Sequence, residues 1–204
     1  MISIPARHYS QAVWAWVDDQ TYTPAWHSAK ISSDNLVESV APEYKDIMAG
    51  YQTAKTLEMI CRKVRPTRIV EVGTFSGFTA FTMQYACDPE VIYTCDKDHA
   101  IVAEDVAGKI KSFPRTRAID MLKTIQPPID LFFLDGRVSA EEVDEMGRLA
   151  SDDAVFVLDD WEGFEKGASN ALLLYIRKVA AIPVFPQHGT QVGMMLKRMA
   201  WVRQ

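Results

Sequence analysis

Two glycines four residues apart are the first residues whose spacing points to a ligand site. Residues 68–72 form a short β-branched run that predicts a buried strand, and Gly73 and Gly77 bracket a tight turn into a helix. Glycine has no Cβ and tolerates unusual φ and ψ, so a ligand can lie close to such a turn and meet the exposed N–H groups of the next helix. The stretch therefore predicts a nucleotide-type binding turn.

The spacing within this turn disfavours two common phosphate sites. A dinucleotide site uses the pattern G-x-G-x-x-G, whose middle glycine lets a pyrophosphate approach. Here Phe75 stands at that position and would obstruct a diphosphate, which disfavours an oxidoreductase. A Walker phosphate loop needs Gly-Lys-Ser/Thr, and no lysine follows Gly77. The pattern that remains is E-x-G-x-x-x-G, from Glu71 to Gly77.

An aspartate ends the second predicted strand. Asp96 comes directly after the run 90–95 and follows Gly73 by about the interval at which nucleotide-binding βαβ units place a carboxylate on ribose hydroxyls. A carboxylate can accept hydrogen bonds from two vicinal hydroxyls at once. Together, the glycine turn and Asp96 predict a cofactor site that receives a ribose.

Three further aspartates follow two later apolar runs. Residues 129–134 lead into Asp135, and residues 154–158 lead into Asp159 and Asp160. Ligands of open α/β sheets bind beyond the carboxyl ends of the strands, where neighbouring strands lie about 4.8 Å apart. Three carboxylates gathered there would raise one another's pKa unless a cation is present, and oxygen ligands suit Mg²⁺. We therefore expect Asp135, Asp159 and Asp160 to bind Mg²⁺; the alternative for Asp159 and Asp160 is a strand end with a helix cap.

The motif from Glu71 to Gly77 resembles the first motif of class I S-adenosylmethionine (SAM) methyltransferases, in the E-I-G-T-x-x-G version of the catechol-type small-molecule O-methyltransferases. The resemblance covers roughly residue 43 to the C-terminus. It implies SAM as cofactor and a Rossmann-like, doubly wound α/β sheet, mostly parallel with an antiparallel edge strand, in the order 3-2-1-4-5-7-6. The predicted cofactor-binding residues are Glu71, Gly73, Thr74, Ser76, Gly77, Asp96, Asp120 and Asp135.

Asp120 has two interpretations. It follows the third predicted strand, 113–119. Members of the resembled family often use residues at this point to reach the adenine edge, so Asp120 is expected to accept from the exocyclic amine. The alternative is that Asp120 caps the N-terminus of a short helix over 121–125.

The later aspartates are similar to those of metal-dependent sugar O-methyltransferases of the macrocin type, which have one aspartate after one strand and an aspartate pair after the next. Catechol-type enzymes usually have Asp-Asn at the pair and commonly a lysine shortly after the first aspartate. Here Asp160 replaces the Asn, and residues 137–139 contain no lysine. Arg137 stays charged and is a poor proton acceptor. The alternatives are activation by the metal, proton removal by His188 or an aspartate such as Asp135, and loss of metal dependence.

Hydrophobic periodicity places these residues on alternating strands and helices. Helices are predicted from Pro42 to Pro66 and over 78–87, 99–111, 140–149 and 167–179. Parallel strands are predicted over 68–72, 90–95, 113–119, 129–134 and 154–158. Two short strands, 182–186 and 191–197, form a hairpin through residues 187–190.

The chain is expected to form one domain, with residues 41–204 as the methyltransferase-like part. Residues 1–40 are an aromatic-rich segment with a predicted short helix over 10–19. Its aromatic residues are Tyr9, Trp14, Trp16, Tyr22 and Trp26. They could cap a planar substrate, contact a second subunit in a homodimer, or pack over one end of the sheet.

Composition narrows the class of protein. The 204 residues include 22 Lys and Arg against 27 Asp and Glu, a net charge of −5, so we expect no nucleic-acid partner. No apolar run of about 18 residues or signal-peptide core is present, and the three cysteines form no CxxC pair, so a cytoplasmic protein without a membrane span, disulfide framework or zinc site is expected.

The sequence therefore predicts a SAM-dependent O-methyltransferase that acts on a hydroxyl of a small metabolite, such as a phenol, catechol or sugar. One alternative is a metal-independent O- or N-methyltransferase, which the missing lysine favours. The other is a non-catalytic SAM-binding module whose aromatic N-terminal segment docks a partner.

Overall fold

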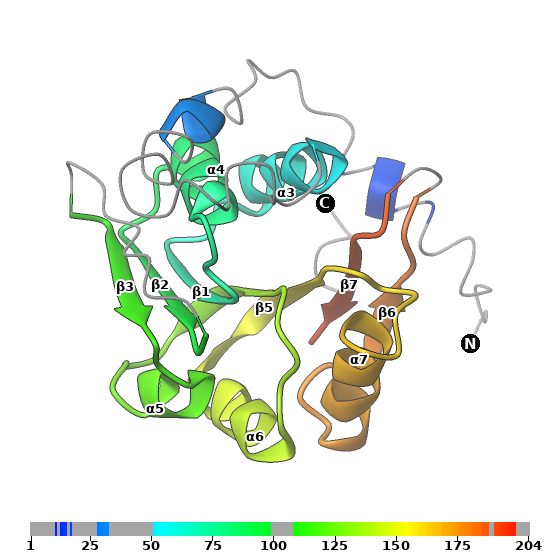
Figure 1. Cartoon of the computed structure of the whole chain (residues 1–204). Coiled ribbons are helices and arrows are strands. Elements are labelled where there is room, and N and C mark those ends of the chain that lie inside the picture. The colour runs from blue at the N-terminus through cyan, green and yellow to red at the C-terminus, as the bar shows by residue number, and fades with distance from the viewer. Residues whose placement is uncertain are drawn as a thin grey trace.

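One mixed sheet organises the protein. The computed structural model describes residues 11, 13–15, 17, 28–32, 51–98, 108–187 and 190–198. Their sheet has the order β3-β2-β1-β4-β5-β7-β6 (Figure 1). The strands are β1 (Arg68–Val72), β2 (Val91–Asp96), β3 (Ile110–Pro114), β4 (Ile129–Leu134), β5 (Ala150–Leu158), β6 (Ile182–Val184) and β7 (Gly193–Leu196).

The strand directions confirm the predicted Rossmann-like sheet. Strands β1 to β5 pair in parallel, whereas β7 is antiparallel to both β5 and β6. The antiparallel strand β7 therefore lies one position inside the sheet, and β6 forms the edge. Parallel strands are covered on both faces, which is why residues 129–134 and 154–158 are continuously apolar or nearly so.

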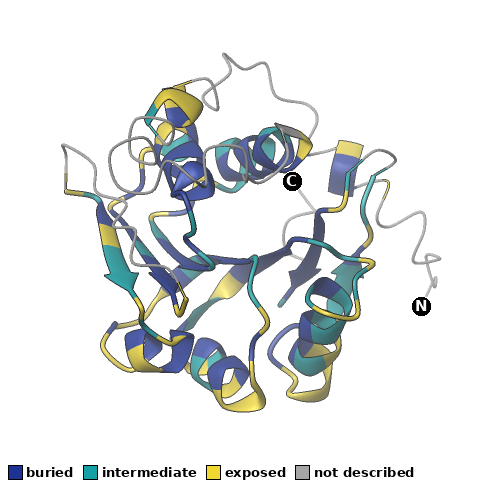
Figure 2. Ribbon diagram, in the orientation of Figure 1, coloured by how far each residue is buried: buried dark blue, intermediate teal, exposed yellow. Residues whose placement is uncertain are grey.

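Helices cover both faces of the sheet. They are α3 (Tyr51–Val64), α4 (Phe78–Cys87), α5 (Ala118–Leu122), α6 (Ala140–Leu149) and α7 (Gly167–Ile176). Helices α3 and α4 lie on one face, and α5, α6 and α7 lie on the other (Figure 1). Successive strand residues point to opposite faces, so Phe133 belongs to the core under α3 and α4, whereas Phe132 belongs to the core over α6 and α7. Figure 2 shows the central strands mostly buried, except near the start of β5, and many exposed positions on the outer sides of the helices and in the loops.

The region around the third strand differs from its prediction. The predicted third strand is present as β3, but it spans Ile110–Pro114 and not 113–119, so the predicted helix over 99–111 cannot extend to residue 111. Of the apolar residues in the predicted strand, Phe113 belongs to β3, whereas Ala118 and Ile119 are buried residues of α5. The packing of α5 on α6 thus outweighs the strand propensity of this short apolar run.

The described part of the N-terminal segment packs on the core. Residues 11, 13–15 and 17 are helical, in agreement with the helix predicted over 10–19. Trp14 is buried, and its Nε1–H donates to the carbonyl of Phe185, beyond the end of β6, at 2.6 Å. Trp14 therefore covers one end of the sheet; the other four aromatic residues of this segment lie outside the described residues.

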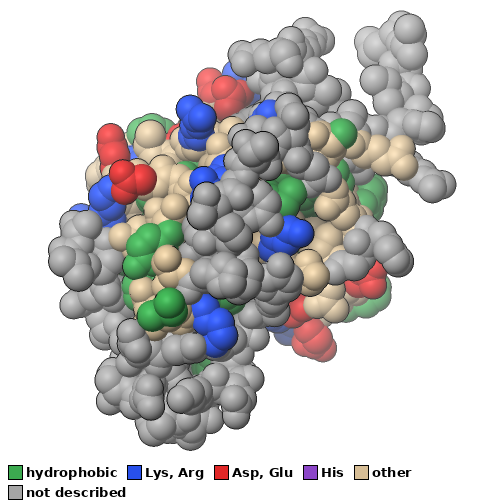
Figure 3. All heavy atoms as spheres, turned by 90° about the horizontal axis from the view of Figure 1, so that it is seen from above, with side chains coloured by type: hydrophobic (Ala, Val, Ile, Leu, Met, Phe, Trp, Pro, Cys, Tyr) green, Lys and Arg blue, Asp and Glu red, His purple; other side chains and the backbone are tan. Residues whose placement is uncertain are grey.

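No helix among the described residues is both long and apolar enough to cross a membrane. On the face seen in Figure 3, described Lys and Arg side chains alternate with Asp and Glu side chains. A cytoplasmic location and the absence of a nucleic-acid partner stay predictions.

Candidate active site

The strand order of the sheet reverses between β1 and β4, and the candidate site lies at this topological switch point. From β1 the chain moves outward to β2 and β3, and then returns to place β4 on the other side of β1. Ligands of open α/β sheets bind in the crevice that such a reversal leaves beyond the strand ends. The turn after β1 and the loop after β4 meet here, because the Asp135 N–H donates to the carbonyl of Val72 at 3.0 Å.

The turn after β1 has the backbone that its glycines suggested. Gly73 and Gly77 have φ values of 104° and 75°, which favour glycine, and Phe75 between them has a φ of 41°. The N–H groups of Gly73 and Thr74 donate to the carbonyl of Cys95 at 2.9 and 3.2 Å, and Gly77 N–H donates to Thr74 at 2.7 Å. The turn is therefore fixed against the end of β2.

Glu71 is buried beneath this turn. Its carboxylate oxygens accept from the hydroxyls of Thr79 on α4 and Thr94 on β2, each at 2.5 Å, and Thr94 also lies 2.5 Å from the hydroxyl of Thr74. Burial raises the pKa of Glu71 to about 8, although both threonine hydrogen bonds oppose the shift. Glu71 thus joins β1, β2, α4 and the turn.

Asp96 braces the turn from the end of β2. Its Oδ2 accepts from the backbone N–H of Phe75 at 3.0 Å, and its Oδ1 accepts from that of Asp98 at 2.9 Å. Each carboxylate oxygen can accept a second hydrogen bond. Asp96 can therefore hold the turn and still receive ligand hydroxyls.

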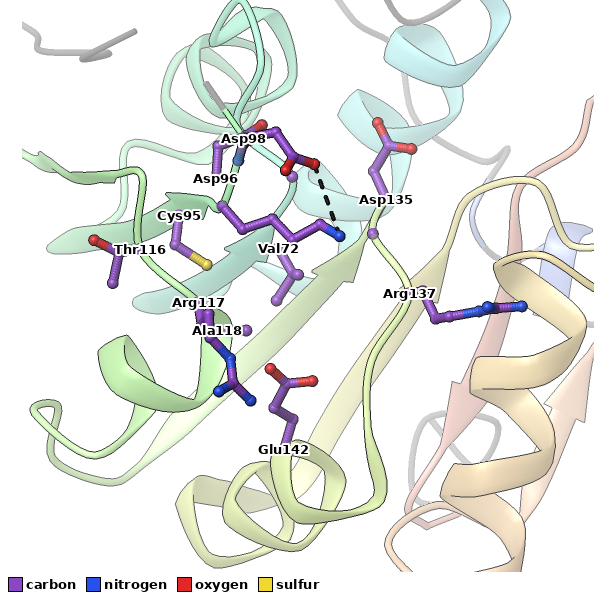
Figure 4. A pocket seen from close by; sticks show the side chains of 13 residues that line it. Val72, Cys95, Asp96, Asp98, Thr116, Arg117, Ala118, Asp135, Arg137 and Glu142 are labelled. Carbon is purple, nitrogen blue, oxygen red and sulfur yellow. Dashed lines mark hydrogen bonds and ion pairs between the residues drawn. The ribbon is translucent and has the colours of Figure 1, made fainter. Parts of the chain in front are cut away.

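A pocket of about 240 Å³ opens beside this turn (Figure 4). Its walls are Val72, Gly73, Cys95, Asp96, Lys97, Asp98, Thr116, Arg117, Ala118, Asp135, Gly136, Arg137 and Glu142. Three predicted cofactor residues, Gly73, Asp96 and Asp135, are among them. Glu71, Thr74, Ser76, Gly77 and Asp120 lie outside the lining set, and the contacts of all eight predicted residues with a cofactor stay predictions.

Asp120 lies in the first turn of α5 and is exposed. The N-cap of this helix is Arg117, so the alternative that Asp120 caps a helix over 121–125 does not apply. Thr116, Arg117 and Ala118, just before it, form the pocket wall on the β3 side. Sequence reasoning missed these three residues because it placed them inside a strand.

Glu142 is a second wall residue that the sequence reasoning missed. It forms a capping box with Ser139, whose backbone N–H donates to Glu142 Oε2 at 2.6 Å. The other oxygen, Oε1, accepts from the N–H of Ile119 at 3.2 Å and so joins α6 to α5. The spacing Ser-x-x-Glu before an apolar run was the signal that could have found it.

The three aspartates of the predicted metal site converge. One carboxylate oxygen from each of Asp135, Asp159 and Asp160 lies within 4.8 Å of the others. Asp135 follows β4, whereas Asp159 and Asp160 follow β5, and Thr53 on α3 donates to Asp159 Oδ1 at 3.2 Å. Three hard oxygen donors at this spacing suit Mg²⁺ chemically.

A lysine enters this cluster from the start of α7. Lys166 Nζ lies 2.8 Å from Asp135 Oδ1 and 2.7 Å from Asp160 Oδ2. The sequence lacks a lysine shortly after Asp135, but the structure supplies one from another element. No local signal marked Lys166, because its position depends on how residues 161–165 turn back over the end of β5.

The cluster perturbs the protonation of its members. Burial and the neighbouring Asp159 charge raise the pKa of Asp135 to about 6, although Lys166 opposes the shift. Burial and the Asp160 charge also raise the pKa of Asp159. Partial burial lowers the pKa of Lys166, but hydrogen bonds to Asp135 and Asp160 outweigh burial and raise it above its usual value. Lys166 therefore carries a positive charge in this cluster at neutral pH.

His188, the other predicted catalytic residue, lies outside the described residues. Arg137 points away from Asp135 (Figure 4), and its guanidinium donates to the backbone carbonyl and carboxylate of Glu165 at 3.0 and 3.3 Å. Lys166 is consequently the only described basic side chain with an ion pair to these three aspartates.

No model of a known protein family and no curated protein sequence matches the chain. Solved structures do match. A methyltransferase from Geobacter sulfurreducens is 17% identical at a TM-score of 0.62, over 91% of this chain and 95% of that one. The O-methyltransferase TomG from Streptomyces achromogenes, involved in tomaymycin synthesis and solved with SAM, is 15% identical at 0.54, over 95% and 98%. A spermidine synthase from Thermotoga maritima is 15% identical at 0.56, over 77% and 61%.

These likenesses define the fold of the chain as that of the class I SAM-dependent methyltransferases, as its glycine motif implied. A spermidine synthase shares the same fold. The fold is therefore compatible with more than one class of enzyme.

Proposed function

We propose that the protein is a SAM-dependent O-methyltransferase that acts on a hydroxyl of a small metabolite, such as a phenol, catechol or sugar. One observation carries the proposal: the pocket beside Gly73 and Asp96 ends at Asp135, which is also a member of the carboxylate cluster. A cofactor held by the first two residues would thus lie next to charged groups that can position a hydroxyl.

The cofactor contacts follow from the pocket walls. Asp96 would accept from the two ribose hydroxyls while it keeps its bonds to the turn. Gly73 leaves room for the ligand at the backbone. The segment from Thr116 to Ala118 joins Asp120 as a candidate for the adenine edge, because it forms the pocket wall after β3.

Methyl transfer from a sulfonium leaves two tasks to the chain, because the methyl group is already activated. The acceptor hydroxyl has to be oriented toward the methyl group, and its proton has to be removed. Asp135 is the first candidate for the base, since it lines the pocket and, without a bound ion, its pKa is raised to about 6, close to neutral pH. His188 stays the second.

A second hollow, of about 150 Å³, is available to the acceptor beside Asp160 and Lys166. It is lined by Asp160, Glu162, Gly163, Glu165, Lys166 and Gln191. Asp135, Asp159 and Asp160 would hold a divalent ion, and such an ion, when bound, lowers the pKa of a hydroxyl that it contacts. The hydroxyl-bearing end of the acceptor would then face Asp160.

A metal-independent methyltransferase is the second candidate. The ion pairs of Lys166 with Asp135 and Asp160 favour it, because an ammonium already supplies a positive charge where the metal would lie. In that case Lys166 would orient the acceptor hydroxyl by donating a hydrogen bond.

Calorimetric titration with SAM tests the cofactor assignment. Asp96→Ala should lower the affinity at least tenfold, since it removes the ribose acceptor and loosens the turn. Asp152→Ala is the control, because Asp152 is exposed on β5 and pairs with Arg198. Wild-type protein that binds no SAM, or undiminished binding in Asp96→Ala, contradicts the assignment.

Methyl transfer to a panel of catechols, other phenols and sugars then tests the reaction. Loss of transfer in excess EDTA would support the metal-dependent enzyme, and full transfer in EDTA the metal-independent one. SAM binding without transfer to any acceptor would favour a non-catalytic SAM-binding module.

A further inference from the structure

Lys166 bridges two of the three candidate metal ligands. Its ammonium bonds to one oxygen of Asp135 and one of Asp160, which come from the ends of two different strands. The lysine side chain is about one-third exposed, so solvent reaches it. The same two carboxylates belong to the set within 4.8 Å that could bind an ion.

The backbone holds Lys166 close to the cluster. A Cβ atom on Gly167 would lie 2.5 Å from the carbonyl oxygen of Asp160 and 2.6 Å from that of Asp159, so only glycine permits this approach. Two turn bonds bring the chain back: Gly163 N–H donates to Asp160 at 2.8 Å, and Lys166 N–H donates to Gly163 at 3.1 Å. Lys166, at the start of α7, is therefore held close to the end of β5.

The Lys166 ammonium and a divalent metal ion would compete for the same oxygens of Asp135 and Asp160. Three carboxylates and one ammonium carry a net charge of −2, so the cluster still attracts a divalent ion. An ion that contacts Asp135 and Asp160 would meet Lys166 on the same side chains, and two cations a few ångströms apart repel each other.

We infer that Lys166 is a tethered cation that competes with a divalent metal ion for Asp135 and Asp160, so that metal binds only as the lysine withdraws. Lys166 is in this sense a positioning residue: it keeps the carboxylates together without a metal and weakens the metal site. The inference rests on the metal site of the proposed function, but it does not depend on SAM binding.

The withdrawal has a path. Lys166 and Asp160 both line the 150 Å³ hollow, where Glu162 and Glu165 are also present. An ammonium released from the cluster would therefore remain close to carboxylates. An ion from solvent would reach Asp160 through the same hollow, which Asp160 lines.

The test is calorimetric titration of the protein with Mn²⁺ alone. Lys166→Met keeps most of the apolar stem and removes the charge, and it should bind Mn²⁺ at least tenfold more tightly than wild type. Mn²⁺ should also raise its Tm more than that of wild type. Lys123→Met is the matched control: Lys123 also pairs with a carboxylate, Glu141 at 2.9 Å, but on the surface of α5, and its loss should leave Mn²⁺ affinity unchanged.

A double variant locates the ion. Asp160→Asn in the Lys166→Met background should abolish the gain. Equal or weaker Mn²⁺ binding in Lys166→Met, or a gain that persists in the double variant, overturns the inference. If Lys166→Met does not fold, Lys166→Gln gives the same comparison. Failure of the SAM titration with a clear Mn²⁺ gain would reject the proposed function alone.

Discussion

The backbone of Gly73 lies against the backbone of Asp135, so closely that a Cβ atom on the glycine would come within 3.2 Å of the Asp135 carbonyl carbon and 3.4 Å of its Cβ. This contact joins the cofactor turn after β1 to the first aspartate of the acidic cluster after β4. The two halves of the candidate site are therefore in backbone contact. A substitution in the turn after β1 should affect the position of Asp135, and a change at Asp135 should affect the turn.

Gly73→Ala should disturb both halves. The φ of 104° is strained for alanine, by roughly 1–2 kcal/mol, and the new methyl group would also press on Asp135. We expect SAM affinity, measured by calorimetry, to fall at least tenfold, with a lower Tm. Gly108→Ala is the matched control: its φ is 66°, but a Cβ there meets nothing within 4 Å, so it should lose stability without losing affinity. Equal SAM affinity in the two variants would contradict this role of the contact.

Asn170 fixes the loop that follows Asp135. Its Nδ2 donates to the carbonyl of Gly136 at 2.9 Å, and its Oδ1 accepts from the N–H of Val138 at 3.1 Å. Asn170→Ala leaves both backbone groups unpaired, at about 1–3 kcal/mol for each buried group. Urea unfolding should show that loss. Leu172→Ala, on the exposed side of the same helix, should change stability by about 0.5 kcal/mol or less. A similar small loss in both variants would mean that water replaces the asparagine.

The cofactor half of the site could be predicted from the sequence because its signals are local. The turn needs glycine at positions of positive φ, and Asp96 and Asp135 each follow directly from an apolar strand. In a parallel sheet, the carboxyl ends of the strands lie at the same edge. The position of a residue directly after a strand can therefore be predicted from the sequence. The convergence of Asp159 and Asp160 with Asp135 follows from the same rule.

The position of Lys166 and the end of the third strand depend on tertiary contacts, which a short sequence motif cannot predict. Lys166 reaches the cluster because Gly167 packs on the Asp160 backbone, and that approach depends on the turn before α7. The bounds of the third strand were mispredicted because Ala118 and Ile119 are apolar whether a strand or a short helix buries them. Packing of α5 on α6 decides between these two outcomes.

Glu71 should make stability depend on pH. Its pKa of about 8 in the folded protein exceeds its usual value of 4.5, so the folded state retains a proton that the unfolded state has lost between these pH values. The free energy of unfolding therefore falls as pH rises from about 4.5 to 8 and is then level, with about 1.4 kcal/mol for each unit of pKa difference. Asp135 adds a slope of the same sign only below about pH 6.

Urea unfolding between pH 6.5 and 8.5 isolates the contribution of Glu71. Glu71→Gln keeps a neutral side chain at all pH values, so its stability should change much less across this window than that of wild type. The two proteins should differ least at the acidic end, where Glu71 is protonated. An identical slope in Glu71→Gln would assign the pH dependence to another group.

Gly167→Ala tests how the end of β5 receives α7. The new Cβ would lie 2.5 Å from the Asp160 carbonyl oxygen and from Trp161 Cα, and backbone atoms of a strand end cannot move aside easily. Overpacking of this kind costs about 1–3 kcal/mol, which urea unfolding would measure. Gly147→Ala in α6 is the matched control, since its Cβ would press at 2.8 Å only on a side-chain methyl of Val179 and alanine favours a helix by about 1 kcal/mol. Gly167→Ala should therefore be clearly the less stable of the two.

Gly167→Ala should also tighten Mn²⁺ binding, as Lys166→Met does, because the new methyl group pushes Lys166 away from the cluster. A folded Gly167→Ala protein that binds Mn²⁺ more weakly than wild type would indicate that the close approach of α7 forms the ion site.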